Sequence, residues 1–156
     1  MWVRLWLLAT LVAGALDITA AIVVSRLGRG VPAARVLQSV ASGVLGRGAF
    51  EGGTGAAALG LLLHFLLMAA IAGIYVLAYQ RSALLRSSPI ALGVVFGLLV
   101  YVVMTYVVVP LSASPIRTPA GRDLLIGMVV HIVCVGLPIA LIVARGTIGQ
   151  RHDVTA

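Results

Sequence analysis

Three ionisable side chains lie inside long apolar stretches of the 156-residue sequence: Asp17, His64 and His131. Carboxylate and imidazole groups can relay protons or ligate a metal ion, and a histidine pair can hold a haem iron. Such groups are rare in apolar segments of about twenty residues, because a charge is costly in hydrocarbon. We therefore expect all three side chains to face the interior of the protein.

The positions of these residues place them at one depth if each stretch is a transmembrane helix. His64 and His131 each follow the start of their predicted helix by about ten residues, or ~15 Å at ~1.5 Å per residue. Asp17 precedes the end of its helix by about eight residues, or ~12 Å, measured from the same side. The sequence therefore predicts a buried polar cluster of Asp17, His64 and His131.

Four further residues are candidate neighbours of this cluster. Tyr101 and Thr105 lie at the same level of the third apolar stretch, Cys134 follows one of the histidines closely, and Glu51 precedes the second stretch. Cys134 is the only cysteine, so the chain can form no internal disulfide and the sequence indicates no redox compartment.

The composition determines what must position these residues. The chain is 62% hydrophobic and 10% charged, and its mean hydropathy is +1.17. It has too few polar side chains to cover the surface of a soluble globule. We therefore predict an integral, multi-pass membrane protein.

The net charge of +7 does not indicate nucleic-acid binding. Every basic residue is an arginine, and the arginines lie singly or in pairs at the ends of apolar runs. That distribution is typical of residues that anchor helices at the membrane surface, whereas a phosphate-binding surface needs a cluster. Six arginines are expected on one side of the membrane and five on the other, so the charges do not orient the chain.

The predicted fold is all-α, a four-helix transmembrane bundle with a short amphipathic interfacial helix between the first two spans. Pro110 is expected to end the third span, and Pro138 to kink the fourth. The amphipathic helix is expected in the membrane interface or against the mouth of the bundle. The predicted spans are residues 3–25, 54–79, 89–109 and 122–143, the interfacial helix is 32–45, the single domain is 1–145, and a polar tail covers 146–156.

Glycines mark candidate packing faces on three of the spans. Gly93 and Gly97 have the small-residue spacing that lets helices approach closely in lipid. Gly60 and Gly127 each precede a histidine by four residues, so the second and fourth spans carry the same Gly-x-x-x-His pattern. The pattern is compatible with two helical hairpins in tandem.

The polar cluster admits three functional interpretations. Its members could satisfy one another by hydrogen bonds in a non-enzymatic accessory or assembly subunit, or in a free-standing bundle. They could instead relay protons or ions in a small coupled transporter centred on Asp17. A haem- or metal-binding redox subunit is the third interpretation. The sequence contains no recognisable catalytic motif, so we predict that the protein is not an enzyme, and we predict no cofactor. The expected partners are the lipid bilayer, other membrane helices or a second copy of the chain.

Three segments carry a resemblance to a known class: LVAGALDITAA, the two Gly-x-x-x-His patterns, and VVVPLSASPIRTP. Together they resemble the small four-helix bacterial inner-membrane proteins of the YagU-like class. The resemblance implies a location in the bacterial inner membrane and the four-helix architecture. It implies no particular activity.

Overall fold

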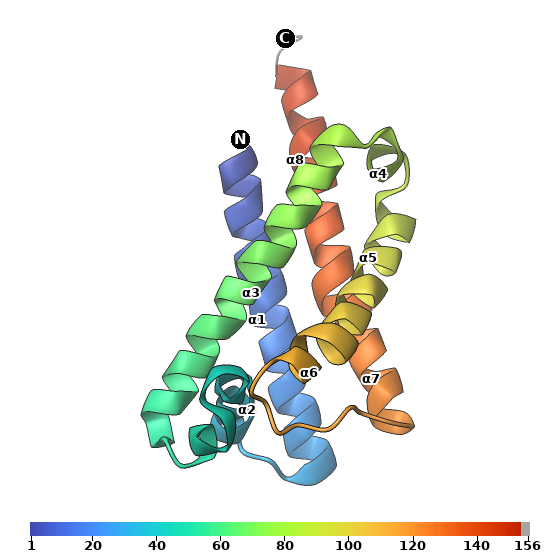
Figure 1. Cartoon of the computed structure of the whole chain (residues 1–156). Helices are drawn as coiled ribbons and strands as arrows, with labels where there is room; N and C mark the ends of the chain where they lie inside the picture. The colour runs from blue at the N-terminus through green and yellow to red at the C-terminus, as the bar shows by residue number, and fades with distance from the viewer. Residues whose placement is uncertain (154–156) are drawn as a thin grey trace.

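The chain folds into a bundle of four long helices, shown by a computed structural model that describes residues 1–153 and the side chains of residues 1–147 (Figure 1). No strand occurs in the described range. The first two long helices are α1 (Trp2–Arg29) and α3 (Gly53–Arg81). The third consists of α5 (Pro89–Val103), η2 (Met104–Val108) and α6 (Val109–Leu111), and the fourth of α7 (Arg122–Val130), η3 (His131–Gly136) and α8 (Leu137–Asp153).

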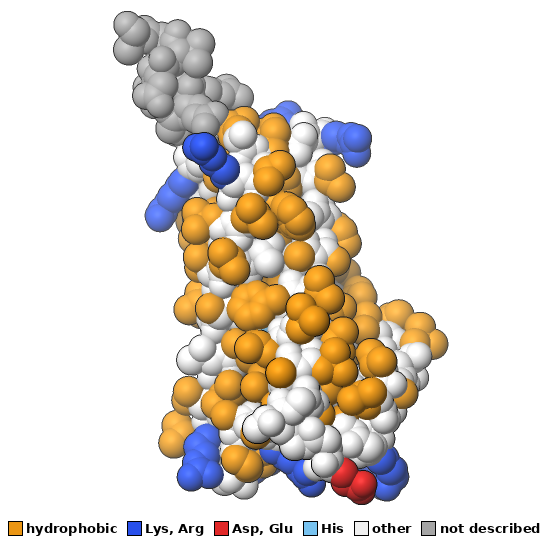
Figure 2. Space-filling model, turned by 90° about the vertical axis from the view of Figure 1, so that its left-hand side faces the viewer, with side chains coloured by type: hydrophobic (Ala, Val, Ile, Leu, Met, Phe, Trp, Pro, Cys, Tyr) orange, Lys and Arg blue, Asp and Glu red, His pale blue; other side chains and the backbone are white. Residues whose placement is uncertain are grey.

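All four long helices are long and apolar enough to cross a membrane, with mean hydropathies between 2.2 and 2.6 over their most apolar windows. On the face shown in Figure 2, hydrophobic side chains cover the middle of the molecule, and arginine side chains lie at both ends. This is the surface that a bilayer requires. The predicted all-α four-helix fold is confirmed, and the chain is a multi-pass membrane protein.

The two ends of the bundle differ in their connections. We call one end the terminal end, because α1 begins there, α8 ends there, and the short helix α4 (Ala83–Ser87) joins α3 to α5 (Figure 1). The opposite end, the loop end, carries α2 (Ala33–Leu45), η1 (Gly46–Phe50) and the connection from α6 to α7.

Helix α2 packs on the first turns of α3, at the mouth of the bundle. The Gln38 side-chain amide donates to the carbonyl of Gly53 at 3.0 Å. Gly60 of α3 faces the Leu37 carbonyl so closely that a Cβ atom at Gly60 would collide with it. Of the two predicted positions for the amphipathic helix, the structure shows close packing on the bundle.

The connection after α6 is in turn tied to α2. The Ala113 amide donates to the Gly43 carbonyl at 3.0 Å, and the Ser42 and Ser114 hydroxyls lie 3.0 Å apart. From there the connection runs across the loop end to α7 (Figure 1).

Both internal prolines of the spans follow a π-helical segment. η2 ends two residues before Pro110, and η3 ends two residues before Pro138. Proline lacks an N–H group, and its ring collides with the carbonyl four residues earlier, so a wider turn relieves both problems. The prediction that Pro110 ends its helix is therefore wrong by two residues, since the helix continues to Leu111. We expected a kink at Pro138, and the structure has η3 just before this residue, which itself lies in α8.

Helix α5 is held against η3 and α8 by glycines on both sides. A Cβ atom at Gly97 would lie 2.7 Å from the His131 carbonyl oxygen, and one at Gly93 would lie 2.9 Å from the Cβ of Ala140. A Cβ atom at Gly136 would collide with the backbone of Gly93 and Gly97. The Gly-x-x-x-Gly pattern therefore packs within the chain, against Gly136.

The hydrophobic core lies where α1, α3, α5 and the η3–α8 segment meet. It combines small residues of α1 with larger residues from the other helices, and α1 contacts both α3 and the η3–α8 segment. Its most buried members include Ala9, Ala13, Ala72, Tyr75, Val135, Ile139, Ala140 and Val143.

We predict that Gly136→Ala lowers the free energy of unfolding by about 1–3 kcal/mol, because the added methyl group has no space against α5. Reversible unfolding in mixed micelles measures this. The matched control is Gly28→Ala in α1, where no atom beyond the adjacent helix backbone lies within 4 Å of the added Cβ. That variant should leave the stability unchanged or raise it by up to about 1 kcal/mol. Equal effects of the two substitutions would contradict the close glycine contact.

Candidate functional site

His64 is a buried histidine that joins two helices. Its side chain on α3 is 7% exposed, and its Nε2 atom lies 2.9 Å from the Gly14 carbonyl oxygen of α1. Because a carbonyl can only accept, Nε2 must carry the proton in this contact. Gly14 makes the close approach possible, since a Cβ atom there would lie 2.6 Å from the Phe65 ring. His64 therefore fixes the position of α1 against α3.

A second bond supports the same helix pair nearer the terminal end. The Trp6 indole N–H of α1 donates to the Ala69 carbonyl of α3 at 2.7 Å. Both contacts are made to backbone carbonyls, which no pattern of side chains reveals. The contact between α1 and α3 is thus polar as well as apolar.

His131 is half-buried at the first residue of η3 and bonds within its own helix. Its Nδ1 atom lies 3.0 Å from the Gly127 carbonyl oxygen. Its ring meets the Tyr101 ring of α5 edge-on, with centroids 5.3 Å apart. Gly127 provides the space for that tyrosine, because a Cβ atom at Gly127 would lie 2.6 Å from the Tyr101 ring.

Asp17 is half-buried on α1. In the part of the chain whose side chains are described, Asp17 makes no hydrogen bond and no ion pair. Among these described side chains, an ion pair joins Arg29 to Asp123 at 3.1 Å, at the loop end. Asp17 is therefore a carboxyl group within a predicted span without a described polar partner.

Among the described side chains, Asp17, His64 and His131 form no hydrogen bonds to one another, which was one of the interpretations of the cluster. Each histidine bonds to a backbone carbonyl that glycine makes accessible, and only His64 is fully buried. Within residues 1–147, no three His, Cys, Asp or Glu side chains lie close enough together to hold a metal ion. The geometry thus gives the metal-site interpretation no support. That the three side chains share one interior region stays a prediction.

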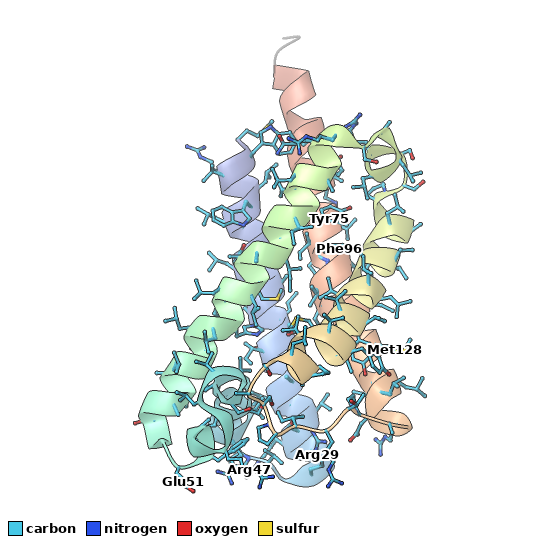
Figure 3. All side chains as sticks on the ribbon, viewed as in Figure 1. Arg29, Arg47, Glu51, Tyr75, Phe96 and Met128 are labelled. Atoms are coloured by element: carbon cyan, nitrogen blue, oxygen red, sulfur yellow. The ribbon has the colours of Figure 1, made fainter. Side chains whose placement is uncertain are left out.

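The predicted neighbours fall into two groups. Tyr101 and Thr105 are buried and Cys134 is half-buried, so these three belong to the interior. Glu51 does not, because it is exposed in the turn before α3 at the loop end (Figure 3).

The hydroxyl groups of Tyr75 and Tyr101 are buried and have no hydrogen-bond partner among the described residues.

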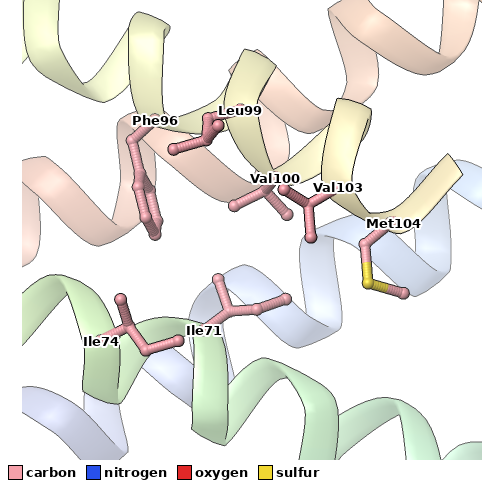
Figure 4. Close-up of a pocket in the computed structure, with 7 residues that line it drawn as sticks. All are labelled: Ile71, Ile74, Phe96, Leu99, Val100, Val103 and Met104. Carbon is pink, nitrogen blue, oxygen red and sulfur yellow. The ribbon is translucent and has the colours of Figure 1, made fainter. Parts of the chain in front are cut away.

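A groove between α3 and α5 is a feature that the sequence did not predict. It has a volume of about 150 Å³, and only apolar residues line it (Figure 4). Its walls are Ile71 and Ile74 of α3 and Phe96, Leu99, Val100, Val103 and Met104 of α5. No sequence signal could have found it, since apolar residues that line a groove and those that face lipid are of the same types.

Comparisons of the chain with protein-family models, with curated proteins and with solved structures found no match. The resemblance to the YagU-like class therefore stays a prediction.

We predict that His64→Leu lowers the free energy of unfolding by about 1 kcal/mol, because it removes a bond between two helices. His131→Leu should cost less, because its bond stays within one helix and the backbone amide of His131 also donates to the Gly127 carbonyl. Denaturation in micelles compares the two variants. His64→Gln, which retains a side-chain N–H donor, should recover part of the loss. A larger effect at His131 would contradict the assignment of His64 as the contact between helices.

Proposed function

We propose that the chain is a non-enzymatic membrane protein that acts as an accessory or assembly subunit for other membrane helices. The observation that carries the proposal is the bond between His64 and the Gly14 carbonyl. Of the two histidines within the spans, the more buried one bonds across a helix contact, and the other bonds to its own helix. Function is then expected at the apolar exterior, which contacts lipid and neighbouring membrane proteins.

We further propose a location in the bacterial inner membrane. This rests on the resemblance of the LVAGALDITAA and VVVPLSASPIRTP segments to the YagU-like class. The near-equal numbers of arginines at the two ends leave both orientations in that membrane open.

The alternative function is a small proton- or ion-coupled transporter, and one observation favours it. Asp17 is a carboxyl group within a predicted span, half-buried, with no hydrogen bond or ion pair among the described side chains. Carboxyl groups in such positions often mark ion pathways.

We predict that the chain, purified from native membranes in mild detergent, is recovered in a complex with another membrane protein at a fixed ratio. Chemical cross-linking before solubilisation, followed by mass spectrometry, identifies the partner. The control is an unrelated tagged four-helix protein expressed at the same level, which should not capture that partner. A visible spectrum of the same sample tests for haem.

Two results would contradict the subunit proposal. One is a chain that is always recovered alone, even after cross-linking. The other is a proton flux in liposomes that the wild-type chain supports and Asp17→Asn abolishes, which would establish the transporter. Asp123→Asn, at the exposed loop end, is the matched control for that flux.

A further inference from the structure

The groove between α3 and α5 exists because these two helices pack on different partners. α5 is held against η3 and α8 by Gly93, Gly97 and Gly136, whereas α3 packs on α1 and α2. The helix pair joined by the short α4 connection meets at the rings of Tyr75 and Phe96, whose centroids lie 4.9 Å apart. Beside this contact, apolar side chains line an open space between the two helices (Figure 4).

The depth and size of the groove limit what can occupy it. Ile74 lies seven residues before Arg81, and Phe96 lies seven residues after Pro89, so the groove begins about 10 Å from the terminal end. Met104 lies about 12 Å deeper. These depths fall in the hydrocarbon of a bilayer. A whole helix of about 10 Å diameter is wider than a groove of about 150 Å³ and would lie across its opening, whereas part of a lipid chain fits inside.

The connection above the groove is positively charged. Arg81 ends α3 and Arg86 lies in α4, and both side chains are exposed. One guanidinium nitrogen of Arg86 donates to the carbonyls of Tyr79 and Gln80 at 3.0 and 3.1 Å, which fixes this side chain near the end of α3. Its remaining N–H groups are available to an anion.

Acidic side chains are described at the opposite end of the bundle. Glu51 and Asp123 are both exposed at the loop end, and on the face shown in Figure 2 an acidic group lies there beside arginines. At the terminal end, Arg4, Arg81, Arg86 and Arg145 face no carboxylate among the side chains of residues 1–147. An anion supplied by the membrane would complement this charge.

We propose that one anionic phospholipid binds on the α3–α4–α5 hairpin, with an acyl chain in the groove and its phosphate at Arg81 and Arg86. Arginine binds phosphate through paired, charge-assisted hydrogen bonds, and basic sites between membrane helices recognise anionic headgroups. The distance of about 10 Å from the arginines to the groove is spanned by the first part of an acyl chain. The site does not depend on the accessory role proposed above.

Native mass spectrometry of the delipidated chain tests the site, with phosphatidylglycerol and phosphatidylcholine of the same chain length as probes. We expect one phosphatidylglycerol per chain, preferred about tenfold or more. Arg81→Gln/Arg86→Gln should remove the preference, and Arg81→Gln alone should reduce it without disturbing the contacts of Arg86. Inorganic phosphate should not displace the lipid, because it has no chain for the groove.

The groove is tested separately with a matched pair of substitutions. Val103→Phe fills the groove and should lower the binding of both lipids, whereas Val102→Phe, on the neighbouring residue outside the lining, should not. Arg117→Gln, in the connection after α6, is the control for the charge.

Three results would overturn the proposal. The first is equal binding of the two lipids, and the second is an unchanged preference in both arginine variants. The third is dimers that Val103→Phe abolishes without an effect on lipid, which would make a second copy the occupant of the groove.

Discussion

A close backbone contact joins α5 to η3 through three glycines, and the position of α5 in the bundle depends on it. Apolar side chains gain little by leaving lipid for a protein interior, so helices in a membrane associate where small residues let their backbones approach. Gly93 and Gly97 face Gly136 with no space for a Cβ atom at any of them. This contact assigns α5 to the η3–α8 segment and so leaves the groove between α5 and α3.

The second constraint is that every backbone polar group must be satisfied without water. The spans contain Pro110 and Pro138, which cannot donate, and the structure places a π segment before each. η3 begins at His131, whose ring bonds to the Gly127 carbonyl beside this irregular turn. Across the bundle, His64 bonds to the Gly14 carbonyl. Both histidines therefore support backbone geometry, which is why the structure favours a packing role for them over shared chemistry.

Much of the fold could be predicted from the sequence, because four apolar runs exceed the thickness of a bilayer and polar connections separate them. The helix ends were less accurate. Arg29 and Arg81 extend α1 and α3 beyond the apolar residues, since long arginine side chains reach the membrane surface while their backbone stays helical. Pro110 was expected to end its helix. The π segment η2 precedes it, and the helix continues to Leu111.

The candidate site was less predictable than the fold. Helical spacing put Asp17, His64 and His131 at one level, but it cannot show the direction of a side chain about the helix axis or the backbone atom that it meets. The sequence also did not predict that Gly136 packs against Gly93 and Gly97, because Gly136 lies on a different helix and is not part of a Gly-x-x-x-Gly pattern. The groove between α3 and α5 depends on this packing of α5 against Gly136, so it too can be recognised only in the three-dimensional structure.

The most direct test of the central contact is a set of nuclear Overhauser effects measured on the unmodified chain in micelles. We predict strong effects between the α-protons of Gly97 and Gly136, because a Cβ atom at Gly136 would lie 2.6 Å from the Cα of Gly97. Nuclear Overhauser effects between backbone protons of α3 and α5 should be weak by comparison. Strong effects between α3 and α5, with none between Gly97 and Gly136, would contradict both the glycine contact and the groove that depends on it.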